Sequence, residues 1–265
     1  MTPGGDRATR TAAAADPVPA GRPATGIPPI NCLDCSLQSL CLVEGLNPQD
    51  LDQLSGMVST RRRVLRGAAL FRAGDRFEAV YPIRFGSFKS RVLTPDGREQ
   101  IIDFPIRGDL LGFDAVSSNR FQSDAIALED AEVCVIPFEE LEAIGRRFAP
   151  LQQRLHRVLS AEIVRDQGQV MMLGTLGAEE RVAAFLVNLS ARLKQRGFSP
   201  REFVLRMTRR EVGSYLALSL ETVSRALSKL QERGVIRLAL KKLTILDDAR
   251  LRTIAGAACA PQPSP

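Results

Sequence analysis

The stretch TRREVGSYLALSLETVSRALSKL, residues 208–230, decides the fold of the C-terminal part of the chain. Thr208 followed three residues later by Glu211 is a capping box, so a helix is expected to begin there. Gly213 has no Cβ and allows a second helix to pack closely against the first, which is expected to end near residues 216–217. Ser219 can cap the second helix. Two short helices joined by a tight turn predict a helix-turn-helix.

The second of these helices has two distinct sides. Its apolar side consists of Val223, Ala226, Leu227 and Leu230, and its polar side of Glu221, Ser224, Arg225 and Ser228. The first turn of a recognition helix meets base edges in the major groove of DNA. There Arg225 can donate two hydrogen bonds to guanine, and Glu221 can accept one from cytosine. Both also have ordinary explanations, since Glu221 complements the helix dipole and Arg225 could be a solvated charge.

Strand-like segments follow on both sides of Lys241-Lys242, which predicts a wing suited to phosphate contacts. The expected DNA contacts are therefore the polar side of the second helix together with Thr208, Thr222 and Lys241. Residues 201–242 carry ten basic and four acidic side chains, an excess of six that equals the formal net charge of the whole chain, +6. A basic surface confined to one domain indicates a nucleic-acid partner.

Upstream, from about residue 61 to 137, the pattern changes to short apolar segments separated by turns, as in AVYPIRFGSFKSRVL and DAEVCVIP. Pro95-Asp96-Gly97 and Gly108-Asp109 mark turns, because glycine accepts the positive φ that such turns need. Strands at this spacing predict a small antiparallel barrel or roll. The expected fold class is α+β, with an N-terminal antiparallel β-roll, a long helix and a C-terminal winged helix-turn-helix.

A long helix is expected between these two parts, because apolar residues recur there every three or four positions. The seam that they form contains Leu155, Leu159, Ile163, Asp166 and Val170. It is narrow and flanked by polar residues, which favours packing along a second helix, as in a homodimer. The alternative is that the same seam packs against the chain's own barrel.

Cys32, Cys35 and Cys41 place three thiols within ten residues. Such soft ligands suit zinc or an iron–sulfur cluster, and the spacing alone does not choose between them. A fourth ligand would have to come from Cys134, Cys259 or His156. Cys134 lies in an expected strand, where a buried cysteine often acts as a small hydrophobic residue. Cys259 lies in an expected tail, and His156 is expected on a helix surface.

We expect five regions: a disordered leader over residues 1–28, the cysteine segment and β-roll over 29–137, the dimerisation helix region over 138–176, the winged helix-turn-helix over 177–250 and a flexible tail over 251–265. The leader lacks the apolar stretch of a signal peptide, and no apolar run could span a membrane. A cytoplasmic protein is therefore expected, in which cysteines seldom form structural disulfides. The sequence shows no P-loop, GxSxG or HExxH and has a single histidine, which argues against an enzyme.

The chain resembles the FNR (fumarate and nitrate reduction) regulators of the cyclic-AMP receptor protein (CRP) superfamily. The resemblance runs from about residue 31 to 246 and is carried by Cys-x2-Cys-x5-Cys, FRAGD, GREQI, GDLLGFDA, VCVIPFEEL, AEERVAAFLVNLS, RGFSPREF and LETVSRAL. It implies a β-roll of the cyclic-nucleotide-binding type, a dimerisation helix and a winged helix-turn-helix. It also implies a 4Fe–4S cluster on Cys32, Cys35, Cys41 and Cys134, DNA reading by Glu221, Ser224 and Arg225, and an acidic residue at the dimer seam, Asp166.

The function that this resemblance implies is oxygen-responsive global regulation of transcription. Such a protein would dimerise without oxygen and bind palindromes in which TTGAT and ATCAA are separated by four bases. It would activate or repress genes of anaerobic metabolism, and the turn Leu93–Arg98 would touch RNA polymerase. The alternative keeps the DNA-binding dimer but makes the cysteines a zinc site or a thiol–disulfide switch.

One departure from the wider superfamily concerns the effector. Relatives that bind cyclic nucleotides carry a Gly-Glu pair and an Arg-Ser pair that hold ribose and phosphate. The matching stretches here read Leu111-Gly112-Phe113-Asp114 and Gln122-Ser123-Asp124, so the glutamate and the arginine are both missing. A cyclic nucleotide is therefore not expected as a ligand.

Overall fold

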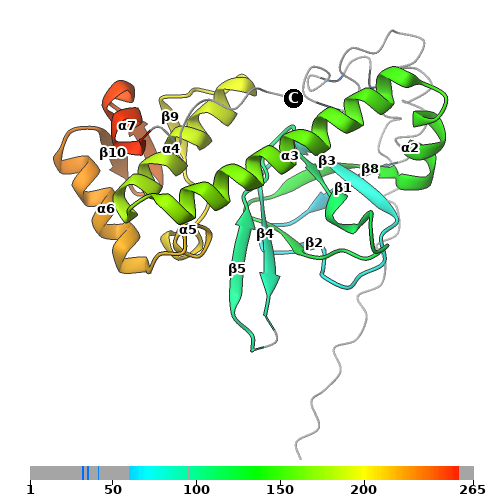
Figure 1. Cartoon of the computed structure of the whole chain (residues 1–265), viewed down its shortest axis with the longest axis horizontal. Coiled ribbons are helices and arrows are strands. Elements are labelled where there is room, and N and C mark those ends of the chain that lie inside the picture. The colour runs from blue at the N-terminus through cyan, green and yellow to red at the C-terminus, as the bar shows by residue number, and fades with distance from the viewer. Residues whose placement is uncertain (1–31, 33–34, 36–40, 42–59, 95, 257–265) are drawn as a thin grey trace, which may run out of the picture.

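The structure is a computed structural model of the 265-residue chain, and it describes Cys32, Cys35, Cys41 and residues 60–94 and 96–256. The leader over residues 1–28, Cys259 and the end of the expected tail lie outside the described residues. A β-roll forms one end of the molecule and a mostly helical domain the other, and the long helix α3 runs along both (Figure 1). The expected α+β class is confirmed.

The β-roll consists of two four-stranded antiparallel sheets, ordered β1-β8-β3-β6 and β2-β7-β4-β5. The strands are β1 (Thr60–Val64), β2 (Ala69–Phe71), β3 (Ala79–Phe85), β4 (Phe88–Leu93), β5 (Glu99–Asp103), β6 (Leu110–Leu111), β7 (Asp124–Ala127) and β8 (Ala131–Pro137), with a short 3-10 helix η2 (Phe113–Ala115). Antiparallel strands fit the short connections that the turn signals predicted.

The interior of the roll is filled by side chains from the facing sheets. Val80, Ile83, Phe88 and Val133 are fully buried. Between β3 and β4 the chain turns sharply at Gly86, whose φ is +87°, and a Cβ there would lie 2.7 Å from the Cβ of Ala131. Only glycine therefore permits this close approach of the β3–β4 turn to the start of β8.

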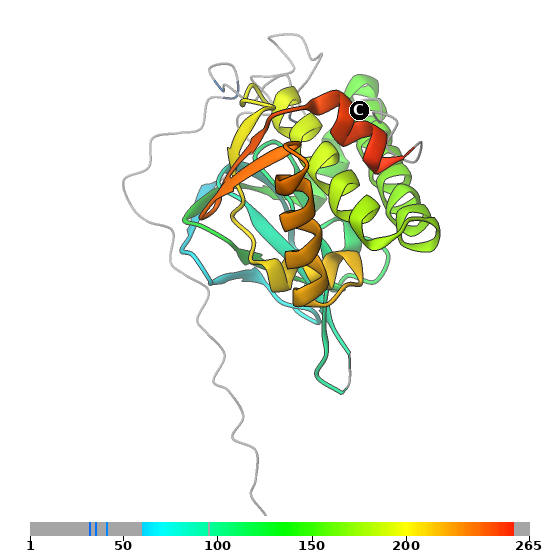
Figure 2. The same ribbon diagram turned by 90° about the vertical axis from the view of Figure 1, so that its left-hand side faces the viewer.

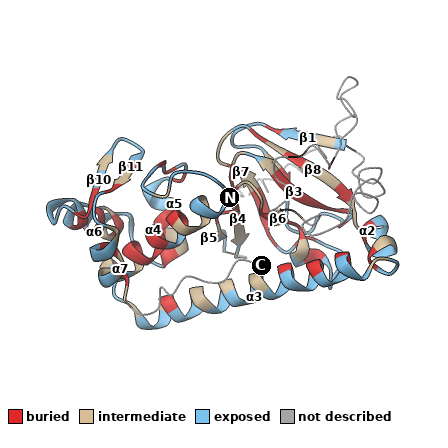
Figure 3. Cartoon of the chain, turned by 90° about the horizontal axis from the view of Figure 1, so that it is seen from above, coloured by how far each residue is buried: buried red, intermediate tan, exposed pale blue. Residues whose placement is uncertain are grey.

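Two helices, rather than one, occupy the region expected for the dimerisation helix. They are α2 (Phe138–Gly145) and α3 (Ala149–Thr175). Pro150 stands in the first turn of α3, where the missing amide hydrogen costs no hydrogen bond. Leu151, Arg154 and Val158 are the buried residues near its start, and the two apolar ones belong to the core of the β-roll. The first half of α3 is thus fixed to the roll, whereas much of its remaining surface is exposed (Figure 3).

The C-terminal domain is a winged helix-turn-helix. Its elements are α4 (Ala178–Gln195), β9 (Glu202–Val204), α5 (Arg209–Leu216), α6 (Leu220–Glu232), β10 (Ile236–Ala239), β11 (Lys242–Ile245) and α7 (Asp248–Ala255). The three strands form an antiparallel sheet in the order β10-β11-β9. Helix α4 packs on α6 and α7 and supplies much of the core, including fully buried Leu186.

The expected tail from residue 251 is wrong in its first residues. Helix α7 continues through residues 251–255, and Leu251 and Ala255 are fully buried against α4. Asp247 caps the helix by accepting a hydrogen bond from the amide of Arg250, 2.9 Å away. The cap and this apolar pair, four residues apart, are the physical reason that the domain extends beyond residue 250.

Within the described residues, no helix combines the length and the apolar character that a membrane crossing requires.

Candidate nucleic-acid interface and cysteine centre

The first helix of the helix-turn-helix, α5, begins as its sequence predicts. The Thr208 hydroxyl accepts a hydrogen bond from the amide of Glu211 (3.2 Å), and the Thr208 amide donates to the Glu211 carboxylate (2.7 Å). A Cβ on Gly213 would lie 2.6 Å from the carbonyl oxygen of Leu218. The turn that follows α5 can therefore pass this close to the helix only at a glycine.

Replacing Gly213 by alanine is expected to lower the free energy of unfolding by about 1–3 kcal/mol, because backbone must move to accept the methyl group. Gly174→Ala is the matched control. Gly174 also lies in a helix, but its Cβ would meet nothing within 4 Å, so alanine there should stabilise by up to about 1 kcal/mol. Urea unfolding followed by circular dichroism measures both. Equal effects at the two positions would contradict the close packing at Gly213.

The recognition helix α6 presents the expected polar side to solvent. The Ser219 hydroxyl caps α6 by accepting a hydrogen bond from the amide of Thr222, 3.1 Å away. Glu221, Arg225 and Ser228 are exposed, whereas the apolar side is buried. Ser224 is half-buried and accepts a hydrogen bond from the side chain of Arg209, 3.3 Å away. Sequence reasoning did not count Arg209 among the DNA contacts, although it lies at the start of α5.

The charge on Glu221 is held locally. Hydrogen bonds from its own backbone amide and from the Ser219 hydroxyl lower the pKa of Glu221, and Arg225 and Arg210 lower it further. The carboxylate is therefore ionised at neutral pH and can only accept hydrogen bonds. That state suits a cytosine amino group, and it also suits the N-terminal end of a helix.

The wing is the hairpin formed by β10 and β11. Leu240 at its turn has a φ of +56° and is wholly exposed, and Lys241 beside it is exposed as well. Lys242, in contrast, pairs with Glu202 at 2.7 Å. Lys241 and Thr208 line one cleft of about 240 Å³, so the wing lies next to the start of α5. Of the two lysines, Lys241 is the better placed for a phosphate.

The described cysteines gather at one end of the β-roll. Cys32 is buried in the core of the roll, and Cys41 and Cys134 pack against the same cluster. Burial first, and then the nearby thiols of Cys41, Cys35 and Cys32, together raise the pKa of Cys134 to about 12. Because the other three thiols act on Cys134, all four predicted ligands lie in one neighbourhood, and none of the four forms a disulfide.

Whether this neighbourhood fits a metal centre depends on donor type and on geometry. Four thiols in a largely apolar setting are the donors that an iron–sulfur cluster or zinc requires. The raised pKa of Cys134 means that the charge of Arg61 does not offset the burial of the thiolate, and a bound metal cation would stabilise the thiolate further. In the described part of the chain, however, no three side chains already stand in metal-binding geometry. The thiols fit the cluster in chemistry and approximate location, and binding would have to draw them together.

One contact joins the cysteine segment to the long helix. Arg154, on α3, is 5% exposed, and its Nε donates a hydrogen bond to the carbonyl oxygen of Cys41, 3.3 Å away. Sequence reasoning missed Arg154, because an arginine within a helix ordinarily faces solvent. A movement of Cys41 would therefore act directly on the start of α3 through this hydrogen bond.

The predicted seam on α3 divides into two parts. Leu155 packs against the core of the β-roll, as the alternative interpretation required. Leu159, Ile163 and Val170 remain exposed, with exposed fractions of 38%, 58% and 71%. Asp166 is exposed between them, and partial burial, followed by the charge of Asp103, raises its pKa. Exposed apolar residues aligned along a helix in this way are typical of surfaces that bind another protein chain.

Two family models match the chain. Residues 61–148 match the cyclic nucleotide-binding domain, and residues 180–254 match the Crp-like helix-turn-helix domain. This pair of domains defines a DNA-binding transcription regulator. Over 227 residues the chain is 44% identical to the fumarate and nitrate reduction regulatory proteins of Shigella dysenteriae and Escherichia coli K12, with 86% of this chain and 91% of each relative covered. The chain therefore belongs to the FNR regulators of the Crp/Fnr family, which are not enzymes.

Solved structures agree with this assignment. The structure of FixK2 from Bradyrhizobium japonicum matches with a TM-score of 0.69 and 29% identity, over 75% of this chain and 98% of that one. A CRP-family transcriptional regulator from Thermus thermophilus matches with a TM-score of 0.61 and 24% identity, over 76% of this chain and all of the other. The second likeness supports the fold alone.

Proposed function

We propose that this protein is an oxygen-responsive regulator that holds a 4Fe–4S cluster on Cys32, Cys35, Cys41 and Cys134. Without oxygen it forms a homodimer that binds palindromic sites in which TTGAT and ATCAA are separated by four bases, and it activates or represses genes of anaerobic metabolism. The observation that carries the proposal is the gathering of four cysteine thiols beside α3 in a chain with a helix-turn-helix. The 44% identity to curated FNR regulators supports it.

The cysteines would serve as ligands and the arginine as the link to the helix. The chemistry that a bound 4Fe–4S cluster supplies is its sensitivity to molecular oxygen. Cys134 holds the site to strand β8, and Cys41 holds it to Arg154 on α3 through its carbonyl oxygen. Loss of the ligand arrangement would release the Cys41 segment and with it the position of the start of α3.

Asp166 would make dimerisation depend on the position of α3. In a homodimer paired along α3, the two Asp166 carboxylates would face one another and repel, and burying each one costs free energy. The exposed stripe of Leu159, Ile163 and Val170 would supply the opposing apolar attraction. A balance this close can be tipped by a small shift of α3.

DNA binding would follow from dimerisation. A palindrome offers two half-sites about one helical turn apart, and two linked recognition helices engage them together. The second contact is then intramolecular, so a dimer binds far more tightly than a monomer. Glu221, Ser224 and Arg225 would read bases, while Thr208, Thr222, Ser228 and Lys241 would contact the backbone or support the readers.

Two further partners are part of the proposal. RNA polymerase would touch the turn Leu93–Arg98, which joins β4 and β5 in a hairpin that extends away from the body of the protein (Figure 2). A cyclic nucleotide would not be an effector. Gln122 and Ser123 stand where relatives that bind cyclic nucleotides have the Arg-Ser pair. The hydroxyl of Ser123 donates a hydrogen bond to the carboxylate of Asp114, 2.8 Å away.

Anaerobic purification of the full chain tests the metal assignment. A brown protein with broad visible absorption, and with iron and sulfide in equal amounts, would support the cluster. A colourless protein that holds zinc would favour the competing proposal of a zinc-controlled dimer. A metal-free protein whose DNA binding follows its thiol content would favour a thiol–disulfide switch.

Arg225→Ala is expected to weaken binding by about 1–3 kcal/mol per half-site and to relax selectivity at the guanine of TTGAT, if Arg225 makes a bidentate contact. Lys241→Ala should weaken binding to all sequences alike and lower the salt dependence, because a phosphate contact releases counterions without reading bases. Titrations on the intact palindrome and on one with the guanine changed, at two salt concentrations, separate the two effects. Equal loss on both sequences for Arg225→Ala would make it a backbone contact.

A further inference from the structure

The DNA-binding domain is packed against the β-roll and is not merely tethered to it. Ile101 of β5 and Phe104 just after it belong to the hydrophobic core of the DNA-binding domain, and both are at most 1% exposed. The ring of Phe104 lies 5.3 Å from that of Tyr215 on α5 and 6.0 Å from that of Phe185 on α4. The two domains therefore share an apolar contact.

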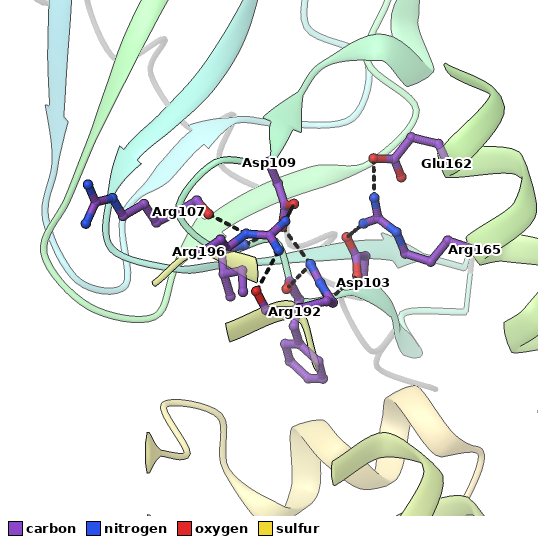
Figure 4. Close-up of polar contacts among 9 residues, drawn as sticks. Asp103, Arg107, Asp109, Glu162, Arg165, Arg192 and Arg196 are labelled. Atoms are coloured by element: carbon purple, nitrogen blue, oxygen red, sulfur yellow. Dashed lines mark hydrogen bonds and ion pairs between the residues drawn. The ribbon is translucent and has the colours of Figure 1, made fainter. Parts of the chain in front are cut away.

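Beside this contact lies a buried carboxylate that is held by the other domain. The side chain of Asp109, just before β6, is 5% exposed. One of its oxygens accepts hydrogen bonds from Arg192 at 2.6 Å and from the amide of Ile106 at 2.8 Å, and the other accepts one from Arg196 (Figure 4). Burial alone would raise the pKa of Asp109, but Arg192 and Arg196 hold it well below its usual range.

The same two arginines also bind backbone atoms of the β-roll. Arg192 donates to the carbonyl oxygen of Phe104 (3.1 Å), and Arg196 donates to that of Arg107 (2.6 Å). Arg192 lies in the last turn of α4, and Arg196 follows just beyond the end of that helix. Each arginine therefore binds both a carboxylate and a backbone carbonyl group of the β-roll. The end of α4 cannot rotate without breaking several of these hydrogen bonds.

The long helix takes part in the same group of charges. Asp103, at the end of β5, lies 3.2 Å from Arg165 of α3 and 3.5 Å from Arg192 of α4. We call Asp103, Asp109, Arg165, Arg192 and Arg196 the interdomain charge cluster. It joins the β-roll, α3 and the DNA-binding domain at one place (Figure 4).

A second polar contact holds the first helix of the helix-turn-helix. Lys89 of β4 pairs with Glu211 at 2.9 Å. The hydroxyl of Ser214 accepts a hydrogen bond from the amide of Ile101 (2.9 Å) and donates to the carbonyl oxygen of Glu99 (3.1 Å). Helix α5 is thus fixed to the β4–β5 hairpin, just as the end of α4 is fixed to the β-roll by Arg192 and Arg196.

None of these contacts covers the residues that would read DNA. Glu221 and Arg225 stay exposed on α6, and α6 packs on both α4 and α5. The covalent connection from α3 to α4 consists only of residues 176–177. We propose that the interdomain charge cluster contains positioning residues for DNA reading: it fixes the direction of α6 relative to α3 and thereby the spacing of the two recognition helices in the dimer. This inference rests on the proposed function, because it requires a palindromic site.

The consequence is a preference for one spacer length. Moving a half-site by one base pair shifts it by about 3.4 Å and rotates it by about 35° around the duplex. A rigidly held domain cannot follow that movement and loses its base contacts, which corresponds to a loss of about tenfold or more in affinity. A domain on a loosened connection can follow it, at the expense of a lower effective concentration at the second half-site.

The test compares Asp109→Asn and Arg196→Gln with the parent chain, each purified whole and without oxygen. Glu179→Gln is the matched control, because Glu179 of α4 pairs with Arg233 inside the DNA-binding domain and spans no domain boundary. Fluorescence anisotropy measures affinity for duplexes in which the half-sites are separated by three, four or five bases, and for a duplex with one half-site altered at its guanine.

We expect the parent and Glu179→Gln to prefer four bases over three or five by about tenfold or more. Asp109→Asn and Arg196→Gln should bind the four-base site more weakly and should lower this preference to within about threefold, while discrimination at the guanine is kept. An unchanged spacer preference in folded, dimeric variants would overturn the inference. The loss of cooperative unfolding in both variants would also overturn it, because the interdomain charge cluster would then be needed for folding itself. A parent chain that binds no palindrome would refute the proposed function instead.

Discussion

Replacing Cys134 by serine is expected to remove most of the bound iron and to abolish DNA binding without oxygen. Serine keeps the size of the side chain but offers a harder, far less acidic donor, which does not replace a thiolate on iron. Cys134 is the one predicted ligand in the β-roll proper, on strand β8 opposite Arg61 of β1. Its loss would therefore also remove the attachment of the proposed centre to strand β8. Cys32→Ser, Cys35→Ser and Cys41→Ser should have the same effect.

The control for these variants is Cys259→Ser, which should keep both iron and activity. Iron and sulfide analysis of protein purified without oxygen gives the first readout, and binding to the palindrome gives the second. Thermal unfolding of the metal-free proteins shows whether Cys134→Ser still folds, as expected for an exchange of similar volume. Normal iron content and full activity in Cys134→Ser would mean that the fourth ligand is another residue.

The features predicted well from sequence depend on neighbours within one or two helical turns. The capping box at Thr208, the cap at Ser219 and the close approach at Gly213 are confirmed. They could be predicted because the two residues in each contact lie at most five positions apart in the sequence. The polar and apolar sides of α6 are likewise fixed by helical periodicity alone. The β-roll was predicted as a class, since turn glycines and short apolar segments reveal strands but not their order.

The features that were missed are non-local or run against the average behaviour of a residue type. Asp109 and Arg192 are separated by 83 positions, and nothing in the local sequence of either points to the other. Arg154 was overlooked for a different reason, since arginine is rarely buried unless it is paired. One of its partners is a backbone carbonyl in the cysteine segment, and no side-chain pattern reveals such an acceptor.

The end of α7 and the buried part of α3 were placed wrongly or left open, although the sequence held signals for both. In α7, the cap at Asp247, the pair Leu251 and Ala255, and the following Gly256 were all visible in the sequence, but the alanine-rich end suggested a tail. In α3, Leu155 belongs to the same heptad-like pattern as Ile163, yet it packs on the roll while Ile163 stays exposed. Periodicity identifies the buried side of a helix and does not say what covers each position along it.

Asp166→Ala is expected to yield a protein that dimerises and binds DNA in air. In the single chain Asp166 is exposed on α3, between Ile163 and Val170, and its pKa is already raised by partial burial and by Asp103. Pairing two copies along this stripe would bury the carboxylates further and bring like charges together. Alanine removes both costs and keeps a strong helix former. The dimer should therefore tighten by about tenfold or more, about 1.4 kcal/mol, without help from the cysteine centre.

Sedimentation of the metal-free protein in air measures this directly, over a concentration series that gives a dimerisation constant. Gln167→Ala is the matched control, because Gln167 is exposed on the next position of α3 and carries no charge. If the seam model holds, Asp166→Asn should also tighten the dimer, although by less, since it removes the repulsion and keeps the cost of burying a polar group. Were metal-free Asp166→Ala to sediment as a monomer at the concentrations where the parent does, the restraint on dimerisation would lie elsewhere. The exposed apolar stripe would then be too weak to pair α3 by itself, and the cysteine centre would have to supply attraction rather than merely release a repulsion.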